Sequence, residues 1–218
     1  MQATDPFRIS AGAARDVRVV LFDLGGVLVQ LSGVAAILEW MNHRITADDL
    51  GPLWLRSPSV RAFETGRLEP LDFAVGILAE LQLDMPPQRF LDAFTDWPTG
   101  LYPGALETIA SIPRRYTRAV LSNSNSLHWS RVMNEMQLGP AFDHHFSSHL
   151  IGKIKPDAEA FHHVLESLGC ESREVLFLDD NLLNVDAARA LGMHAALVRG
   201  ANEARLALEQ AGVIATRA

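Results

Sequence analysis

The stretch that decides the fold is VRVVLFDLGGVL, residues 17–28. Its first half is a short run of β-branched and apolar residues, which is typical of a strand buried on both faces. The run ends on Asp23, and the two glycines that follow let the backbone approach a ligand closely. A carboxylate in this place predicts either a capped turn or a reactive group, and the polar residues at the other strand ends bear on that choice.

Two further runs resemble the first, RAVLSN at 118–123 and EVLFLD at 174–179, and both also end on polar residues. Additional strands are predicted at 194–199 and 144–148. Helical patterns separate them, as in the segment 157–169, where Pro156 suits the first helical turn and Gly169 the exit. This alternation predicts an α/β fold with a doubly wound parallel sheet, in which ligands gather at the carboxyl ends of the strands.

The segment 33–97 interrupts the alternation, because it shows helical periodicity and no convincing strand. It is predicted to be an inserted α-helical cap that covers the active site and moves relative to the core. The core then comprises residues 17–32 and 98–218, and residues 1–16 form a flexible leader. Hinges are expected at Ser32-Gly33 and at 96–104, where proline and glycine are frequent.

The amino-acid composition limits the kinds of molecule that the protein is expected to bind. The chain has 218 residues, 48% of them hydrophobic, and a net charge of -7, so nucleic acid and anionic membranes would be repelled by the average surface. No apolar run reaches the length of about 20 residues that spans a bilayer. The single cysteine, Cys170, requires no oxidising compartment. A cytoplasmic protein acting on a small molecule is therefore expected, as a monomer or a homodimer.

The strand ends supply chemistry suited to a phosphate and a cation. Asp179 and Asp180 repel one another unless a cation or a proton intervenes, and with Asn184 they offer oxygen ligands to a hard divalent ion. The alternative is that this acidic pair only caps a helix. Ser122 offers a hydroxyl to an anion, and Lys155 offers a cation to both the anion and Asp23.

In this order the residues resemble the four motifs of the haloacid dehalogenase-like (HAD) superfamily. The motifs are D23LGGVL, LS122N, K155P and FLDDNLLN at 177–184, and the resemblance spans residues 17–200. The helical insert and FETGRL at 63–68 are similar to the branch that includes glucose-1-phosphate-type sugar phosphatases and the phosphatase domain of soluble epoxide hydrolase.

The resemblance implies a magnesium-dependent phosphatase that acts on a small phosphorylated metabolite through a phosphorylated Asp23. It also implies Mg²⁺ held by the carboxylates of Asp23 and Asp180 and the backbone carbonyl of Gly25. The remaining roles are supporting ones. Asp179 and Asn184 would hold the metal ligands in place, while the phosphoryl group would be bound by Ser122, Asn123 and Lys155.

One position departs from the family pattern. Phosphatases of this family usually carry a second Asp two residues after the nucleophile, as the proton donor to the leaving oxygen, and here that position is Gly25. A solvent chain, the cap residue Glu64 or the substrate itself could replace it. Gly25 also supports an alternative, a catalytically weakened member that binds a phosphorylated ligand or a protein. A metal-free haloacid dehalogenase is the remaining alternative, although it would not need the acidic pair.

The histidines and tryptophans leave further alternatives. A metal site among His144, His145, His149, His162 and His163 is disfavoured, because their spacing fixes no set of converging ligands. His128 follows the second motif, where packing and substrate contact are both open. Trp40, Trp54, Trp97 and Trp129 are expected to be mostly cap or hinge residues that pack through their large apolar area, with any that faces the cleft able to stack on a substrate.

Overall fold

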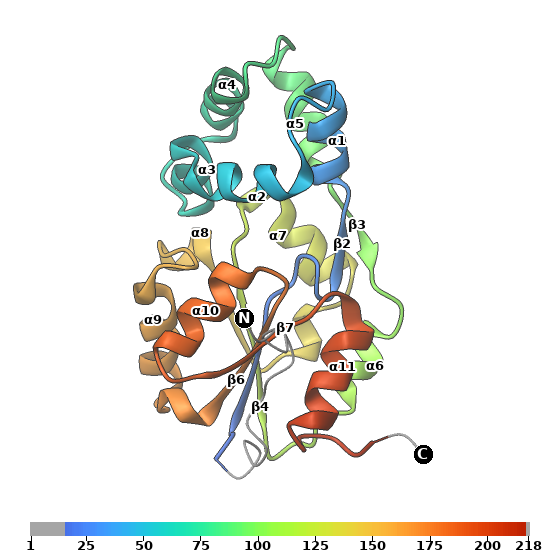
Figure 1. The fold of residues 1–218 in the computed structure, drawn as a ribbon, viewed down its shortest axis with the longest axis vertical. Helices are drawn as coiled ribbons and strands as arrows, with labels where there is room; N and C mark the ends of the chain where they lie inside the picture. The colour runs from blue at the N-terminus through green and yellow to red at the C-terminus, as the bar shows by residue number, and fades with distance from the viewer. Residues whose placement is uncertain (1–15, 217–218) are drawn as a thin grey trace, which may run out of the picture.

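The structure is a computed structural model, and it describes residues 16–216. All but the last residue of the expected leader, 1–16, lies outside the described residues. Figure 1 shows a sheet-containing core with a group of helices above it. The two parts are joined by two extended segments.

The core sheet has five parallel strands in the order β5-β4-β1-β6-β7. The strands are β1 (Val19–Phe22), β4 (Thr117–Ser122), β5 (His144–Ser147), β6 (Val175–Asp179) and β7 (His194–Leu197). The chain builds outward from β1 on one side through β4 and β5, and on the other through β6 and β7. The predicted doubly wound parallel sheet is confirmed, including the short strand at 144–148.

Both faces of the central strands are buried, which explains why these strands are mostly apolar runs. Val20 and Phe22 of β1 pack in one hydrophobic cluster with residues of the helices at 105–110 and 200–210. Val19 and Leu21 pack in a second cluster with residues of the helices at 158–168 and 182–190. Alternate side chains of a strand point to opposite faces. A strand covered on both sides therefore needs apolar residues at every position.

The helical segments of the core follow the strands in the expected alternation. Their bounds are α6 (Ala105–Ala110), α7 (Ser126–Ser130), the π-helical turn η2 (Arg131–Glu135), η3 (Gly139–Ala141), α8 (Ser148–Ile151), α9 (Ala158–Leu168), η4 (Ser172–Glu174), α10 (Leu182–Ala190) and α11 (Gly200–Gln210). Gly169 ends α9 in the left-handed conformation, as predicted. The placement of Pro156 in the first turn of that helix is wrong, because Asp157 is the N-cap and Pro156 precedes it.

The segment between the first two core strands contributes five helices. They are α1 (Gly33–Trp40), α2 (Ala47–Arg56), α3 (Pro58–Glu64), α4 (Pro70–Leu81) and α5 (Pro87–Thr95), and we call them the lobe. The lobe has its own hydrophobic cluster, in which Phe73 lies between Phe63 and Phe94 at ring distances of 4.3 and 5.1 Å. Across residues 16–216, none of the helices combines the length and apolar character that a membrane crossing requires.

The connections between lobe and core are paired with each other, a feature that the sequence analysis missed. β2 (Val29–Leu31) and β3 (Pro98–Leu101) form a two-stranded antiparallel ribbon, which we call the neck. Ser32 extends the pairing, since its backbone N–H donates to the carbonyl of Trp97 at 3.0 Å. The expected hinge segments thus overlap a hydrogen-bonded ribbon.

Candidate active site

Three strand ends meet at the carboxyl edge of the sheet. Phe22 of β1 lies in register with Val120 of β4 and Leu178 of β6. The next residue along β1 is Asp23, whose backbone N–H donates to the carbonyl of Leu178 at 2.8 Å. Parallel strands therefore bring Asp23 beside the end of β6, where Asp179 and Asp180 follow.

Lys155 joins two of these carboxylates from the loop before α9. Its Nζ lies 2.7 Å from Oδ1 of Asp23 and 2.7 Å from Oδ2 of Asp179. The lysine is only 1% exposed, and a buried charge of this kind is stable only when it is paired. Burial alone would lower the pKa of Lys155, but Asp179 and Asp23 outweigh it and raise that pKa. Lys155 is therefore a fixed ammonium group.

One lysine does not balance three carboxylates. Burial, opposed by Lys155 and assisted by the charge of Asp179, raises the pKa of Asp23 to about 6. Burial and the charges of Asp23 and Asp179 raise the pKa of Asp180 to about 7. Gly26 makes this crowding possible, because a Cβ at its positive φ of 74° would lie 2.0 Å from Oδ2 of Asp180. The arrangement has excess negative charge at the mouth of the sheet.

Asp179 accepts hydrogen bonds from residues at the start of α10. The side-chain amide of Asn184 donates to both its oxygens at 3.0 and 3.1 Å, and the backbone N–H of Asn181 donates to Oδ1 at 2.8 Å. Oδ1 of Asn184 is buried and has no hydrogen-bond partner in the described part of the chain. An acceptor with a free lone pair therefore remains beside the carboxylates.

The residues predicted to bind phosphate are not equivalent in the structure. Asn123 lines the cavity, but its amide accepts from the backbone N–H of Lys155 at 2.9 Å and donates to the Lys155 carbonyl at 3.0 Å. Its side chain thus fixes the Lys155 loop. Ser122 is 3% exposed at the end of β4 and is not among the residues that line the cavity. Its contact with a phosphoryl group stays a prediction.

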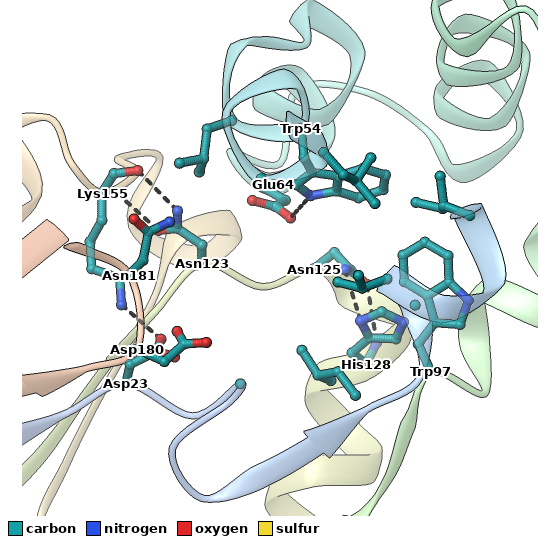
Figure 2. A pocket seen from close by; sticks show the side chains of 18 of the residues that line it. Asp23, Trp54, Glu64, Trp97, Asn123, Asn125, His128, Lys155, Asp180 and Asn181 are labelled. Atoms are coloured by element: carbon teal, nitrogen blue, oxygen red, sulfur yellow. Dashed lines mark hydrogen bonds and ion pairs between the residues drawn. The ribbon is translucent and has the colours of Figure 1, made fainter. Parts of the chain in front are cut away.

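A cavity of about 300 Å³ lies between this edge and the lobe. Figure 2 shows its two sides, with Asp23, Asp180 and Lys155 on the core side and Trp54 and Glu64 on the lobe side. Most of the lobe residues in its wall were not predictable from the sequence. Helical periodicity shows which residues face the interior of a helical group, but not which of them border an opening toward another part of the chain.

Glu64 is the one carboxyl group that the lobe contributes to the cavity wall within residues 16–216. It is 8% exposed, and its Oε1 accepts from Nε1 of Trp54 at 3.4 Å. Burial raises the pKa of Glu64 to about 7, with a further contribution from the charge of Asp23. Glu64 can therefore hold or release a proton near neutral pH.

His128, at the opposite side of the cavity, has both ring nitrogens engaged. Oδ1 of Asn125 caps α7 by accepting from two backbone N–H groups, so the amide nitrogen of Asn125 must face Nδ1 of His128, at 3.1 Å. Nδ1 is then an acceptor, and Nε2–H donates to the carbonyl of Phe94 in the lobe at 2.6 Å. Burial lowers the pKa of His128 to about 4, which agrees with a neutral ring. His128 links core and lobe.

The remaining histidines and the tryptophans lie in several separate parts of the structure. Within residues 16–216, no three His, Cys, Asp or Glu side chains are grouped so as to hold a metal by themselves. Trp54 and Trp97 line the cavity. Trp40 packs on the lobe cluster, whereas Trp129 belongs to α7 and packs on the core.

Comparison with known proteins agrees with the geometry. The family model described as haloacid dehalogenase-like hydrolase matches residues 17–192. A sesquiterpene phosphatase of Aspergillus oryzae is 32% identical over 184 residues, which cover 81% of this chain and 87% of that protein. Phosphoglycolate phosphatase 1 of Pseudomonas aeruginosa is 27% identical, with 97% of this chain and 79% of that protein covered.

A solved structure supports the fold. The crystal structure of a HAD family enzyme from Bacteroides thetaiotaomicron, in complex with magnesium and inorganic phosphate, superposes with a TM-score of 0.64. The two sequences are 24% identical, and the match covers 82% of this chain and 92% of that one.

Proposed function

The chain belongs to the haloacid dehalogenase-like hydrolase family, and from that membership we propose that it is a magnesium-dependent phosphatase acting on a small phosphorylated metabolite. The observation that carries the proposal is the buried Lys155 between Asp23 and Asp179 at the wall of the cavity. A strong cation there can offset the charge of an anion that approaches Asp23.

The residues present fit a magnesium ion. Asp23, Asp180 and the carbonyl of Gly25 would hold it, and the unpaired Oδ1 of Asn184 lies close behind them as an acceptor for a ligand water. Two carboxylates and one carbonyl are a sufficient protein contribution, since Mg²⁺ usually keeps several waters. When bound, the ion would neutralise the excess carboxylate charge and polarise the phosphoryl oxygens.

In the proposed reaction, Asp23 donates an electron pair to phosphorus as the bond from phosphorus to the ester oxygen breaks. The departing alkoxide takes up a proton, and water then hydrolyses the aspartyl-phosphate to inorganic phosphate. Lys155 stays protonated throughout and stabilises the charge that builds up on the phosphoryl oxygens. Asn123 positions Lys155 by holding its backbone on both sides.

The proton for the leaving oxygen must come from elsewhere than position 25. We assign it to Glu64, because this carboxyl group lines the same cavity and lies across it from Asp23 and Asp180 (Figure 2). Its raised pKa keeps a proton available near neutral pH. A catalytically weakened binding module is the second candidate, which the glycine at position 25 favours.

Release of phosphate from a panel of phosphorylated metabolites, with and without Mg²⁺, tests the proposal. Asp23→Asn should abolish turnover while the protein stays folded by circular dichroism. Asp72→Asn, on the exposed face of α4, is the matched control and should keep full activity. Activity in Asp23→Asn, or full activity in excess chelator, would contradict the mechanism. Metal-dependent phosphate binding without turnover would instead support the second candidate.

A further inference from the structure

We infer that the substrate is the monophosphate of an apolar alcohol, an inference that rests on the proposed phosphatase function. Its phosphate would lie at Asp23, and its hydrocarbon body would occupy the half of the cavity that faces the lobe. The two halves belong to one cavity, so a group bound at Asp23 extends directly toward the lobe.

The wall of the lobe-facing half is made of hydrocarbon surface contributed by the neck, α1, α2 and α5. The residues are Leu31, Val34, Ile37, Leu50, Trp54, Leu55, Phe94 and Trp97. A closely packed interior would leave no such surface uncovered. Ile37, Leu50, Phe94 and Trp97 are already largely buried. An apolar ligand would therefore cover mainly the exposed parts of Leu31, Val34, Trp54 and Leu55, at a gain of about 25 cal/mol per Å².

Most of the polar groups in this half are already bonded within the protein. The Trp54 indole donates to Glu64, and the amide of Asn125 is shared between its helix cap and His128. Both nitrogens of His128 are engaged. The Trp97 indole nitrogen has no hydrogen-bond partner within residues 16–216, but it is buried and therefore not exposed to a ligand hydroxyl in the cavity. Sugar hydroxyls would therefore find few partners here, and burying unpaired hydroxyls costs free energy.

The charges of the cavity also disfavour a second anionic group. Of the residues between 16 and 216 that line it, Lys155 is the one lysine or arginine. Its ammonium group is already shared by two carboxylates. His128 is held neutral by its hydrogen bonds. A substrate carrying a carboxylate as well as the phosphate would leave that carboxylate without a cation.

The apolar half opens to solvent beside the neck. Leu31 and Val34 line the cavity, yet each is 50% exposed. A hydrocarbon chain can therefore enter past these side chains, and a chain longer than the cavity can extend beyond them. Chain length is therefore the informative variable.

A series of n-alkylphosphonates, from ethyl to decyl, tests the inference by calorimetry on the magnesium-loaded protein. These probes are not hydrolysed, so the result does not depend on turnover. Burial of each methylene is worth about 0.8 kcal/mol, so Kd should fall about threefold to fourfold per methylene until the cavity is full. The 2-phosphonoacetate and sugar phosphonate probes should bind more weakly than hexylphosphonate.

Val34→Asn and Val75→Asn form a matched pair. Val34 lines the cavity and is 50% exposed, whereas Val75 lies on α4, outside the cavity wall, and is 53% exposed. Val34→Asn should weaken binding of octylphosphonate by about threefold or more, equal to one lost methylene contact, and leave methylphosphonate unchanged. Val75→Asn should change neither.

Two results would overturn the inference. One is an affinity that does not depend on chain length, and the other is tighter binding of phosphonoacetate or a sugar phosphonate than of hexylphosphonate. Both can be observed while p-nitrophenyl phosphate is still hydrolysed, so they contradict the substrate class and leave the phosphatase function standing. The converse result, chain-length-dependent binding without hydrolysis of any ester, supports the apolar site and contradicts the phosphatase function.

Discussion

Gly25 is a residue at which this chain departs from the phosphatases it resembles, and a side chain can be accommodated there once Leu31 moves. A Cβ on Gly25 would approach Cδ1 of Leu31 to 2.8 Å. That atom is the end of a half-exposed side chain, which can rotate away. No positive φ is required at Gly25, in contrast to Gly26. The absence of a carboxylate is therefore not imposed by local packing.

Gly25→Asp should restore a proton donor near the leaving oxygen. Because Glu64 is assigned as the acid of the wild type, the added carboxyl group should raise hydrolysis of alkyl phosphates by less than the ~10²-fold that a first general acid contributes. Esters with good leaving groups, such as p-nitrophenyl phosphate, should gain much less, because a good leaving group departs without protonation. The measurement is kcat/KM on both classes of ester. A uniform loss on both, with Mg²⁺ binding preserved, would show that the glycine makes room for the ligand instead.

Glu64→Gln tests the assignment of the acid to the lobe. The variant should lose about 10²-fold or more in kcat on alkyl phosphates and change little on p-nitrophenyl phosphate. The exposed Glu39→Gln on α1 is the control. The acid must be protonated, and the pKa of Glu64 is raised to about 7 by burial and by the charge of Asp23, against the opposing charges of Lys155 and Arg61. Wild-type activity on alkyl phosphates should therefore fall as pH rises through about 7.

Comparing alkyl phosphates with p-nitrophenyl phosphate distinguishes a catalytic role of Glu64 from a structural one. A purely structural role for Glu64, through its hydrogen bond from Trp54, would lower activity on both ester classes equally. The double variant Gly25→Asp, Glu64→Gln should regain activity on alkyl phosphates, because the new carboxyl group replaces the lost one. Failure of that rescue, with an intact fold, would count against Glu64 as the acid.

Much of the catalytic end was predictable from residue type and spacing alone. Asp23, Asp179 and Lys155 stand at strand ends or just before a helix, and parallel pairing necessarily gathers such positions at one edge. The bonding state of Asn123 and the placement of Ser122 were not predictable, because each depends on which neighbour the side chain meets after folding. The apolar wall depends likewise on how the lobe sits over the core.

At the scale of elements, the sheet was predictable and the neck was not. The central core strands β1, β4 and β6 are runs of four to six residues that are mostly apolar and stand between helical patterns, so their composition identifies them. The strands of the neck, Val29–Leu31 and Pro98–Leu101, are three and four residues long and lie far apart in the chain. Too few residues alternate in either to give a pattern. Their pairing arises because the lobe between them closes into one body with its own core.

Helix α7 meets helix α5 through a hydrogen bond that depends on pH. His128 must be neutral to accept from Asn125 and donate to Phe94. Its pKa of about 4 in the folded protein is below the ordinary 6.5, so the folded state binds fewer protons than the unfolded state. Stability should therefore fall as pH drops from about 6.5 toward 4, by on the order of 1–3 kcal/mol.

His128→Gln should remove that part of the pH dependence, because glutamine does not titrate in this range. Urea unfolding at several pH values measures it, and His162→Gln, at an exposed position of α9, is the control. The free energy of unfolding of the variant should vary less with pH than that of the wild type. An unchanged pH profile would show that the link between α7 and α5 does not involve a neutral His128.

At the scale of the whole molecule, the structure is in a closed arrangement held at several separate points. Arg61 of the lobe pairs with Asp157 at the start of α9, and Arg131 of the core pairs with Asp96. These pairs are partly exposed, so each contributes little by itself. In the proposed reaction closure matters because it places Glu64 over the site. The position of the lobe should therefore govern turnover more than global stability.

Gly66 is a point at which lobe and core approach closely through backbone. It follows α3 at a φ of 72°, and a Cβ there would lie 2.6 Å from the backbone carbonyl oxygen of His149 in α8. Gly66→Ala should force the lobe away from the core, since a backbone atom cannot rotate aside. The expected result is a larger radius of gyration by small-angle X-ray scattering, with faster proteolysis at the neck and reduced kcat.

The positive φ of Gly66 would itself disfavour alanine, so a control must carry the same strain without the clash. Gly169→Ala provides it, because Gly169 has a φ of 60° at the end of α9 and a Cβ there would meet no described atom within 4 Å. Both variants should lose about 1 kcal/mol of stability, but only Gly66→Ala should open the molecule. If the two variants behave alike in scattering and turnover, contact at Gly66 does not set the position of the lobe, and closure must depend on the ion pairs and His128 instead.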